Sequence, residues 1–113
     1  MENKEYIGID NFKKLEIKIG HILEVEKIEG ADKLLKLSVS FGEEKPRQIV
    51  SGIALYFPDP QTLVGKKCAF ATNLEPRVIR GFESQGMILA VSGDDFFSLL
   101  ETNEKVIPGA SVK

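Results

Sequence analysis

The sequence LEIKIGHILEVEKIEGADKLLKLSVSFGEEKPRQIV (residues 15–50) decides the fold, because apolar and polar residues alternate along it. Alternation with a period of two is typical of strands that bury one face. The phase of the alternation shifts near Gly20–His21, which predicts a bulge or sharp bend inside a long first strand. Turns containing glycine divide the stretch into three expected strands, at residues 15–28, 35–41 and 47–53.

The rest of the chain continues with short elements separated by Gly and Pro. These are a short helical segment at 58–64, a strand at 66–72, an irregular link at 73–85 and a strand at 86–91. Five strands with one small helix between the third and fourth match the order of elements in the oligonucleotide/oligosaccharide-binding (OB) barrel. A sandwich, the main competitor, usually has more strands. We therefore expect an all-β fold, a five-stranded OB Greek-key barrel with short helices and a C-terminal extension.

Length and composition predict a single domain covering residues 1–113, in which 42% of residues are hydrophobic and 28% are charged. Residues 1–8 are expected to form a loose end, and residues 92–113 a C-terminal extension. Cys68 is the only cysteine, which excludes an internal disulfide and favours a reducing cytoplasm. No apolar run approaches the roughly 20 residues that span a bilayer, so no membrane partner is expected.

The sequence offers little for catalysis. His21 is the only histidine and Cys68 reads as a small core residue, so neither a metal cluster nor a Cys–His pair is expected. Asp94 and Asp95 read as a solvated turn, and the chain has no Gly-rich phosphate loop. We therefore predict a protein that is not an enzyme and needs no cofactor and no metal.

The link after the fourth predicted strand carries the side chains suited to nucleic acid. Its two arginines can hold phosphates, and its amides and hydroxyl can read the edges of unpaired bases. Phe82 is the aromatic residue of the link that we expect to be exposed for base stacking. The predicted nucleic-acid contacts are Lys33, Lys36, Arg47, Asn73, Arg77, Arg80, Ser84, Gln85 and Met87. The formal net charge of −2 favours a small discrete site over indiscriminate wrapping.

Four ordered motifs resemble the tRNA-binding domain that is appended to many methionyl-tRNA synthetases and also occurs as a free-standing protein. They are GADKLLKL (30–37), RQIVSGIA (47–54), LVGKK (63–67) and NLEPRVIRGFESQGMILA (73–90). The resemblance implies an OB barrel that binds tRNA by structure, largely without regard to sequence, and assists a methionyl-tRNA synthetase. Val78 stands where many relatives have a second basic residue beside Arg77, which implies a weaker cationic patch.

The resemblance also implies a homodimer. The apolar run at Phe96, Phe97, Leu99 and Leu100 suits an isologous interface, although the run could instead fold back on its own barrel. Two other functions stay open. One is an export-related, chaperone-like dimer of the same superfamily, whose members lack the GADKLLKL and ESQGM patterns. The other is an assembly module that tethers a synthetase and touches tRNA only weakly.

Overall fold

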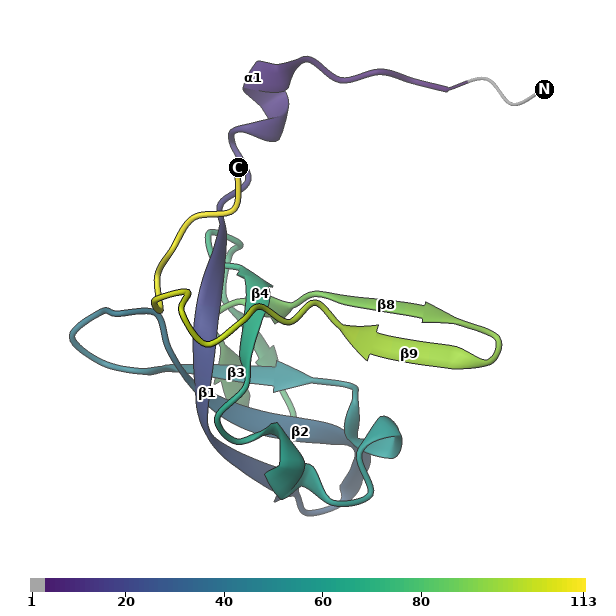
Figure 1. Ribbon diagram of the computed structural model, residues 1–113. Helices are drawn as coiled ribbons and strands as arrows, with labels where there is room; N and C mark the ends of the chain where they lie inside the picture. The colour runs from purple at the N-terminus through teal and green to yellow at the C-terminus, as the bar shows by residue number, and fades with distance from the viewer. Residues whose placement is uncertain (1–3) are drawn as a thin grey trace.

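The computed structural model describes residues 4–113 and consists mainly of strands (Figure 1). In chain order the elements are α1 (Ile9–Phe12), β1 (Ile17–Ile28), β2 (Ala31–Ser40), β3 (Arg47–Ser51), the 3-10 helices η1 (Ala54–Tyr56) and η2 (Pro60–Leu63), β4 (Lys67–Ala71), β5 (Arg77–Ile79), β6 (Phe82–Ser84), β7 (Met87–Ile88), β8 (Ala90–Gly93) and β9 (Phe96–Leu99). Residues 4–8 of the predicted loose end are exposed and outside any helix or strand. Residues 1–3 of that end lie outside the described residues.

One antiparallel sheet forms the body, with the strand order β3-β2-β1-β4-β7. The first three strands form a meander, and β4 then crosses to the free side of β1. The all-β prediction is confirmed. Strand β2 begins at Ala31, earlier than the expected start at residue 35, so Lys33 lies within the strand and not before it.

The predicted bend at Gly20–His21 was placed slightly too early. The register between β1 and β2 shifts between Ile22 and Glu24, so Leu23 is the additional residue and lies partly exposed. Gly20 has a different function. A Cβ atom there would lie 2.5 Å from Val39 Cγ1 and 2.9 Å from Phe70 Cδ1, so only glycine lets β1 pass this close to the core.

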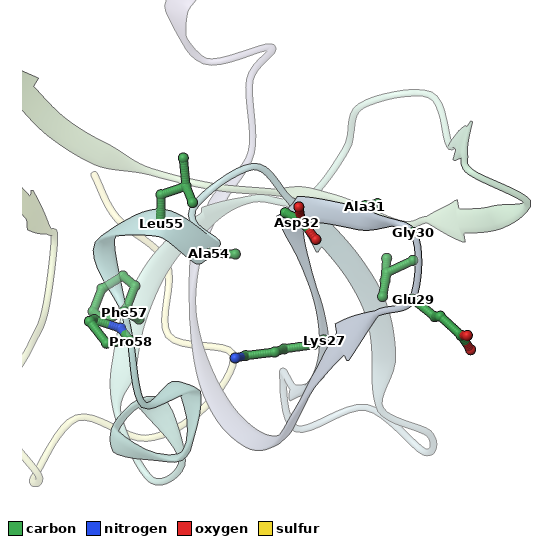
Figure 2. A pocket seen from close by; sticks show the side chains of 10 residues that line it. Lys27, Glu29, Gly30, Ala31, Asp32, Ala54, Leu55, Phe57 and Pro58 are labelled. Atoms are coloured by element: carbon green, nitrogen blue, oxygen red, sulfur yellow. The ribbon is translucent and has the colours of Figure 1, made fainter.

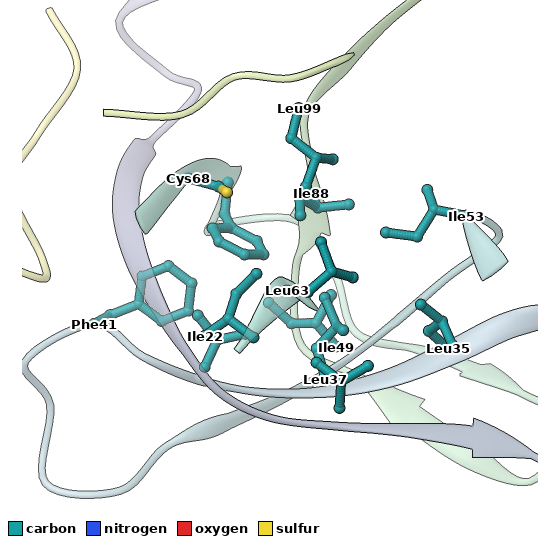
Figure 3. Close-up of a cluster of buried hydrophobic side chains, with 13 residues drawn as sticks. Ile22, Leu35, Leu37, Phe41, Ile49, Ile53, Leu63, Cys68, Ile88 and Leu99 are labelled. Carbon is teal, nitrogen blue, oxygen red and sulfur yellow. The ribbon is translucent and has the colours of Figure 1, made fainter. Parts of the chain in front are cut away.

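A cluster of buried apolar side chains fills the interior of the curved sheet (Figure 3). Phe70 is fully buried and meets Phe41 edge to face, with 5.3 Å between the ring centroids. Cys68 is fully buried in the same cluster, as predicted for a small core residue. Burial raises the pKa of its thiol to about 11, so the sulfur stays protonated near neutral pH. Leu99, from the C-terminal extension, completes the cluster.

The strands do not close into a continuous hydrogen-bonded barrel. Between β3 and the end of β6, together with Gln85 after it, single hydrogen bonds replace a strand ladder. The Gln85 N–H donates to the Gln48 carbonyl at 2.8 Å, and the Val50 N–H donates to Ser84 Oγ at 3.0 Å. The Gln48 side-chain amide also donates to the Glu83 carbonyl at 2.9 Å. Side chains therefore supply much of this junction, which we call the seam.

The C-terminal part differs most from the expected elements. The predicted strand at 86–91 is divided at Leu89 into β7 and β8, because the chain leaves the main sheet there. Strands β8 and β9 pair only with each other and project from the body as a hairpin (Figure 1). The chain then returns along β4 and β1, where the Ala69 N–H donates to the Leu100 carbonyl and the Val112 N–H to the Ile17 carbonyl.

Candidate nucleic-acid interface

The predicted irregular link contains a regular hairpin formed by β5 and β6. Its two-residue loop is Arg80-Gly81, with φ angles of 53° and 84°. Two positive φ values in succession are typical of a type I′ turn, where Asn-Gly is the usual pair. Among residues 4–113, Arg80 is the one non-glycine residue with positive φ. Holding a bulky residue in this conformation costs about 1–2 kcal/mol, and such strain concentrates at functional positions.

The hairpin is fixed to the sheet by a small apolar cluster. Ile79 and Phe82 pack against buried residues that include Val50 of β3. The ammonium of Lys36 lies 4.6 Å from the centroid of the Phe82 ring and 3.3 Å from a carboxylate oxygen of Glu26. Phe82 is therefore half-buried, and its prediction as an exposed stacking residue is wrong. Lys36 therefore helps to hold the hairpin through its cation–π contact with Phe82, and it also places a positive charge beside the hairpin.

Three predicted cations remain free at the surface. Lys33, Arg77 and Arg80 are exposed, and none of them makes an ion pair with another residue in the described part of the chain. Val78, at the position where a second basic residue was expected, is 73% exposed and lies between the two arginines. The exposed hairpin thus carries two arginines, with an exposed apolar residue between them in the sequence.

Arg47 is committed to contacts within the protein. Its guanidinium donates to both carboxylate oxygens of Glu43, at 2.9 and 2.8 Å, and to the Thr72 carbonyl at 2.7 Å. The hydrogen bond from Arg47 lowers the pKa of Glu43, and the same bond raises the pKa of Arg47. This arginine therefore holds the loop before β3 against the end of β4.

The residues predicted to read base edges also bond within the chain. The side chain of Asn73 accepts from the Glu16 N–H at 2.8 Å and donates to the Lys14 carbonyl at 2.6 Å. Ser84 is buried and donates to the Gly86 carbonyl in addition to its bond across the seam. The side-chain oxygen of Gln85 accepts from the Gln48 N–H at 3.1 Å. The polar side chains of Asn73, Ser84 and Gln85 therefore hold the shape of the site. Because they already bond within the chain, fewer of their donors and acceptors remain free to contact a base.

A shallow hollow of about 240 Å³ lies at the foot of the hairpin. It brings together three residues predicted from the sequence, Arg77, Ser84 and Met87. Met87 is 46% exposed at the end of the sheet, so it is a surface residue and not part of the core. Sequence reasoning missed the three other members of the wall, Leu74, Glu75 and Gly86, although all stand in the same motif. Leu74, Glu75, Arg77, Ser84, Gly86 and Met87 line the hollow.

The four apolar residues predicted at a dimer interface divide into two pairs. Phe96 and Leu100 are exposed, whereas Leu99 is buried in the core of its own chain. Phe97 stacks on Tyr56, with 4.0 Å between ring centroids and 7° between ring planes. The extension therefore folds back on its own body in part and leaves one apolar face uncovered.

A larger hollow, of about 670 Å³, lies between the β1–β2 turn and η1 (Figure 2). Figure 2 shows Lys27 extending toward Phe57 and Pro58. Glu29 and Asp32 also line it, so acidic groups outnumber basic ones and the hollow is a poor site for a polyanion.

No group of three or more potential metal ligands occurs within residues 4–113. None of the helices in these residues is long and apolar enough to cross a membrane.

Comparison with known protein families shows which family the chain belongs to. The sequence model described as "Putative tRNA binding domain" matches residues 17–111. The chain belongs to this tRNA-binding domain family. A methionine–tRNA ligase from Lactococcus lactis is 44% identical over 107 residues, which cover 94% of this chain but only 16% of the ligase. The resemblance stated from the sequence motifs is thereby confirmed.

Solved structures agree with this tRNA-binding domain family. A MetRS-related protein from Pyrococcus horikoshii superposes with a TM-score of 0.90 at 40% identity, covering 97% of this chain and 100% of that one. The chaperone CsaA from Bacillus anthracis superposes with a TM-score of 0.83 over 96% of this chain and 100% of that one. At 23% identity the second similarity shows the shared fold alone.

Proposed function

We propose that this domain binds tRNA, without chemistry of its own, and so assists a methionyl-tRNA synthetase in the cytoplasm. The observation that carries the proposal is the β5–β6 hairpin, which packs on the sheet through Ile79 and Phe82 and whose turn holds an exposed arginine at a φ of 53°. Membership of the tRNA-binding domain family indicates that the ligand is tRNA. Because the chain spans 16% of the ligase it resembles, the action of the whole protein is part of the proposal.

The geometry favours recognition of the phosphate backbone. Arg77 and Arg80 project from one short hairpin, and a guanidinium can bind a phosphate through two parallel hydrogen bonds. Lys33 adds a further free cation on β2. The hairpin is already fixed by Phe82 and by the seam, so binding orders few additional residues and little conformational entropy is lost. Contacts of this kind recognise the shape of a folded RNA more than its sequence.

The proposal is tested by measuring tRNA affinity against salt. Three phosphate contacts should make log K fall with log salt at a slope of about −2 to −3. Affinity that does not respond to salt would exclude binding led by phosphates. The same filter-binding series should include a DNA duplex and an unfolded polypeptide, each at matched concentration. Preference for the polypeptide would support the chaperone-like function, for which the exposed side chains of Leu55, Tyr56 and Phe96 could supply an apolar surface.

We further propose that the protein acts as a homodimer. Phe96 and Leu100 on the C-terminal extension are exposed, and so are Ile9 and Phe12 of α1. Exposed apolar groups of this size favour association. Sedimentation at micromolar concentration should give a dimer that Phe96→Ser weakens. A monomer throughout the concentration range would refute this part of the proposal and leave tRNA binding untouched.

A further inference from the structure

The hollow at the foot of the β5–β6 hairpin contains a group that phosphate binding does not explain. Glu75 lines it together with Arg77. A carboxylate beside an arginine weakens the attraction of that arginine for phosphate. No ion pair joins Glu75 to another residue in the described range, so it is not committed to holding the fold. Glu75 is exposed and free to accept hydrogen bonds.

The rest of the wall suits a flat ring. Leu74 and Met87 are 43% and 46% exposed, and both line the hollow. Methionine adapts its shape to an aromatic surface and makes favourable sulfur–aromatic contacts. The volume of about 240 Å³ is smaller than the roughly 300–1,000 Å³ of clefts that hold drug-sized ligands. The hollow therefore has room for one unpaired base, with the attached sugar and phosphate outside it.

We propose that this hollow binds a single unpaired guanine of the RNA, with Glu75 as the residue that selects the base. An ionised carboxylate only accepts hydrogen bonds. On its Watson–Crick edge guanine presents two adjacent donors, N1–H and N2–H, which match the two carboxylate oxygens. Adenine, cytosine and uracil each set an acceptor beside their donor on that edge, so each leaves a carboxylate oxygen facing an acceptor.

Arg77 and Met87 complete the recognition. Arg77 lines the same hollow, and its guanidinium can hold the phosphate attached to the bound guanine. Met87 packs on the face of the ring. Ser84 contributes shape only, because its hydroxyl already bonds to the Val50 N–H and the Gly86 carbonyl. The inference rests on the proposed RNA-binding function and adds one base-specific contact to binding that otherwise ignores sequence.

The test uses stem–loop RNAs that are identical except for one unpaired loop nucleotide, which is G, A, C or U. Fluorescence anisotropy with the full chain should show roughly tenfold tighter binding of the G loop, in the range of one bidentate base contact. Glu75→Gln should reduce that preference to about twofold or less, since an amide offers one acceptor and one donor. Affinity for the A loop should stay constant or rise, because a negative charge is removed.

Glu83→Gln is the matched control. Glu83 is exposed on β6 of the same hairpin and lies outside the hollow, so its variant should leave the G-to-A ratio unchanged. Equal affinity of the parent for all four loops, while tRNA still binds, would overturn the guanine inference alone. An unchanged ratio in Glu75→Gln would do the same. Failure of both tRNA and the stem–loops to bind would overturn the proposed function and the inference together.

Discussion

The turn at the tip of the hairpin permits a test that separates folding from binding. Replacing Arg80 with Asn removes the guanidinium and installs the residue that a type I′ turn prefers at this position. Arg80 is exposed with a φ of 53°, so little packing is lost and backbone strain is relieved. The free energy of unfolding in urea should therefore stay constant or rise by up to about 1 kcal/mol. Most substitutions that abolish binding also lower the free energy of unfolding, so an unchanged or higher stability would show that Arg80→Asn acts on binding alone.

The binding side of the same substitution has a defined magnitude. One phosphate contact through charge-assisted hydrogen bonds contributes about 1.5–3 kcal/mol, which corresponds to a loss of roughly 10- to 150-fold in tRNA affinity. Loss of one contact should also make the slope of log K against log salt shallower by about 0.7–0.9. Arg80→Lys, which retains the charge, should lose less. Titration of fluorescent tRNA at several salt concentrations measures both quantities.

Lys105→Asn provides the control for net charge, because it removes one exposed cation outside the hairpin. Its affinity should fall by less than about twofold, in keeping with a distant surface charge in physiological salt. If Arg80→Asn and Lys105→Asn weaken binding equally, the reasoning about the hairpin is refuted, and only overall charge matters. A marked fall in stability of Arg80→Asn would refute the interpretation of the turn.

Three further predictions concern the fold. Gly20→Ala should lower the free energy of unfolding by about 1–3 kcal/mol, because the added methyl group would overlap three core side chains. The control is Gly52→Ala, which has open space around it and should change the free energy of unfolding by under about 0.5 kcal/mol. The pKa of Glu43 is lowered in the folded state, so its pairing with Arg47 stabilises the protein fully above the unfolded pKa of 4.5 and is lost as the pH falls below it. Glu43→Gln should therefore flatten the acid limb of stability by less than about 1 kcal/mol, measured by urea unfolding at several pH values. Cys68, with its pKa raised to about 11 by burial, should react with a disulfide reagent only after unfolding by urea; rapid labelling of the native protein would contradict its burial.

Alternation predicted the strands well where one face of each strand meets the core. Residues 35–41 show this, because Leu35, Leu37 and Val39 are all fully buried and their neighbours are not. The start of β2 was missed because Asp32 and Lys33 have no apolar alternation to mark them. They lie in an irregular part of the strand, where the pairing with β1 passes from Ala31 opposite Ile28 directly to Leu35 opposite Lys27. The hairpin at 77–84 was read as irregular because Arg80 stands where Asn or Gly usually signals a two-residue turn.

For the predicted RNA contacts, the sequence indicated residue types but not the bonds that they make within the folded chain. Residue type showed that Arg77 and Arg80 could bind phosphate, and the structure leaves both exposed. The same residue types gave no sign that Asn73 and Ser84 would bond within the chain, because partners such as Glu16 and Val50 are distant in sequence. Long-range hydrogen bonds of this kind depend on the completed fold, which single-sequence reasoning does not contain.

The two ends of the folded body meet side by side. The Val112 N–H donates to the Ile17 carbonyl at 2.9 Å, and the backbone of Lys18 pairs with that of Ser111 in an isolated antiparallel β-bridge (Figure 1). A body whose entry and exit points are adjacent can be placed in an exposed loop of a host protein without stretching that loop. Residues 17–112 are thus suited to insertion into a host protein as one unit. Inserting these residues into an exposed loop of an unrelated enzyme would show whether the proposed affinity for RNA is carried by the domain alone.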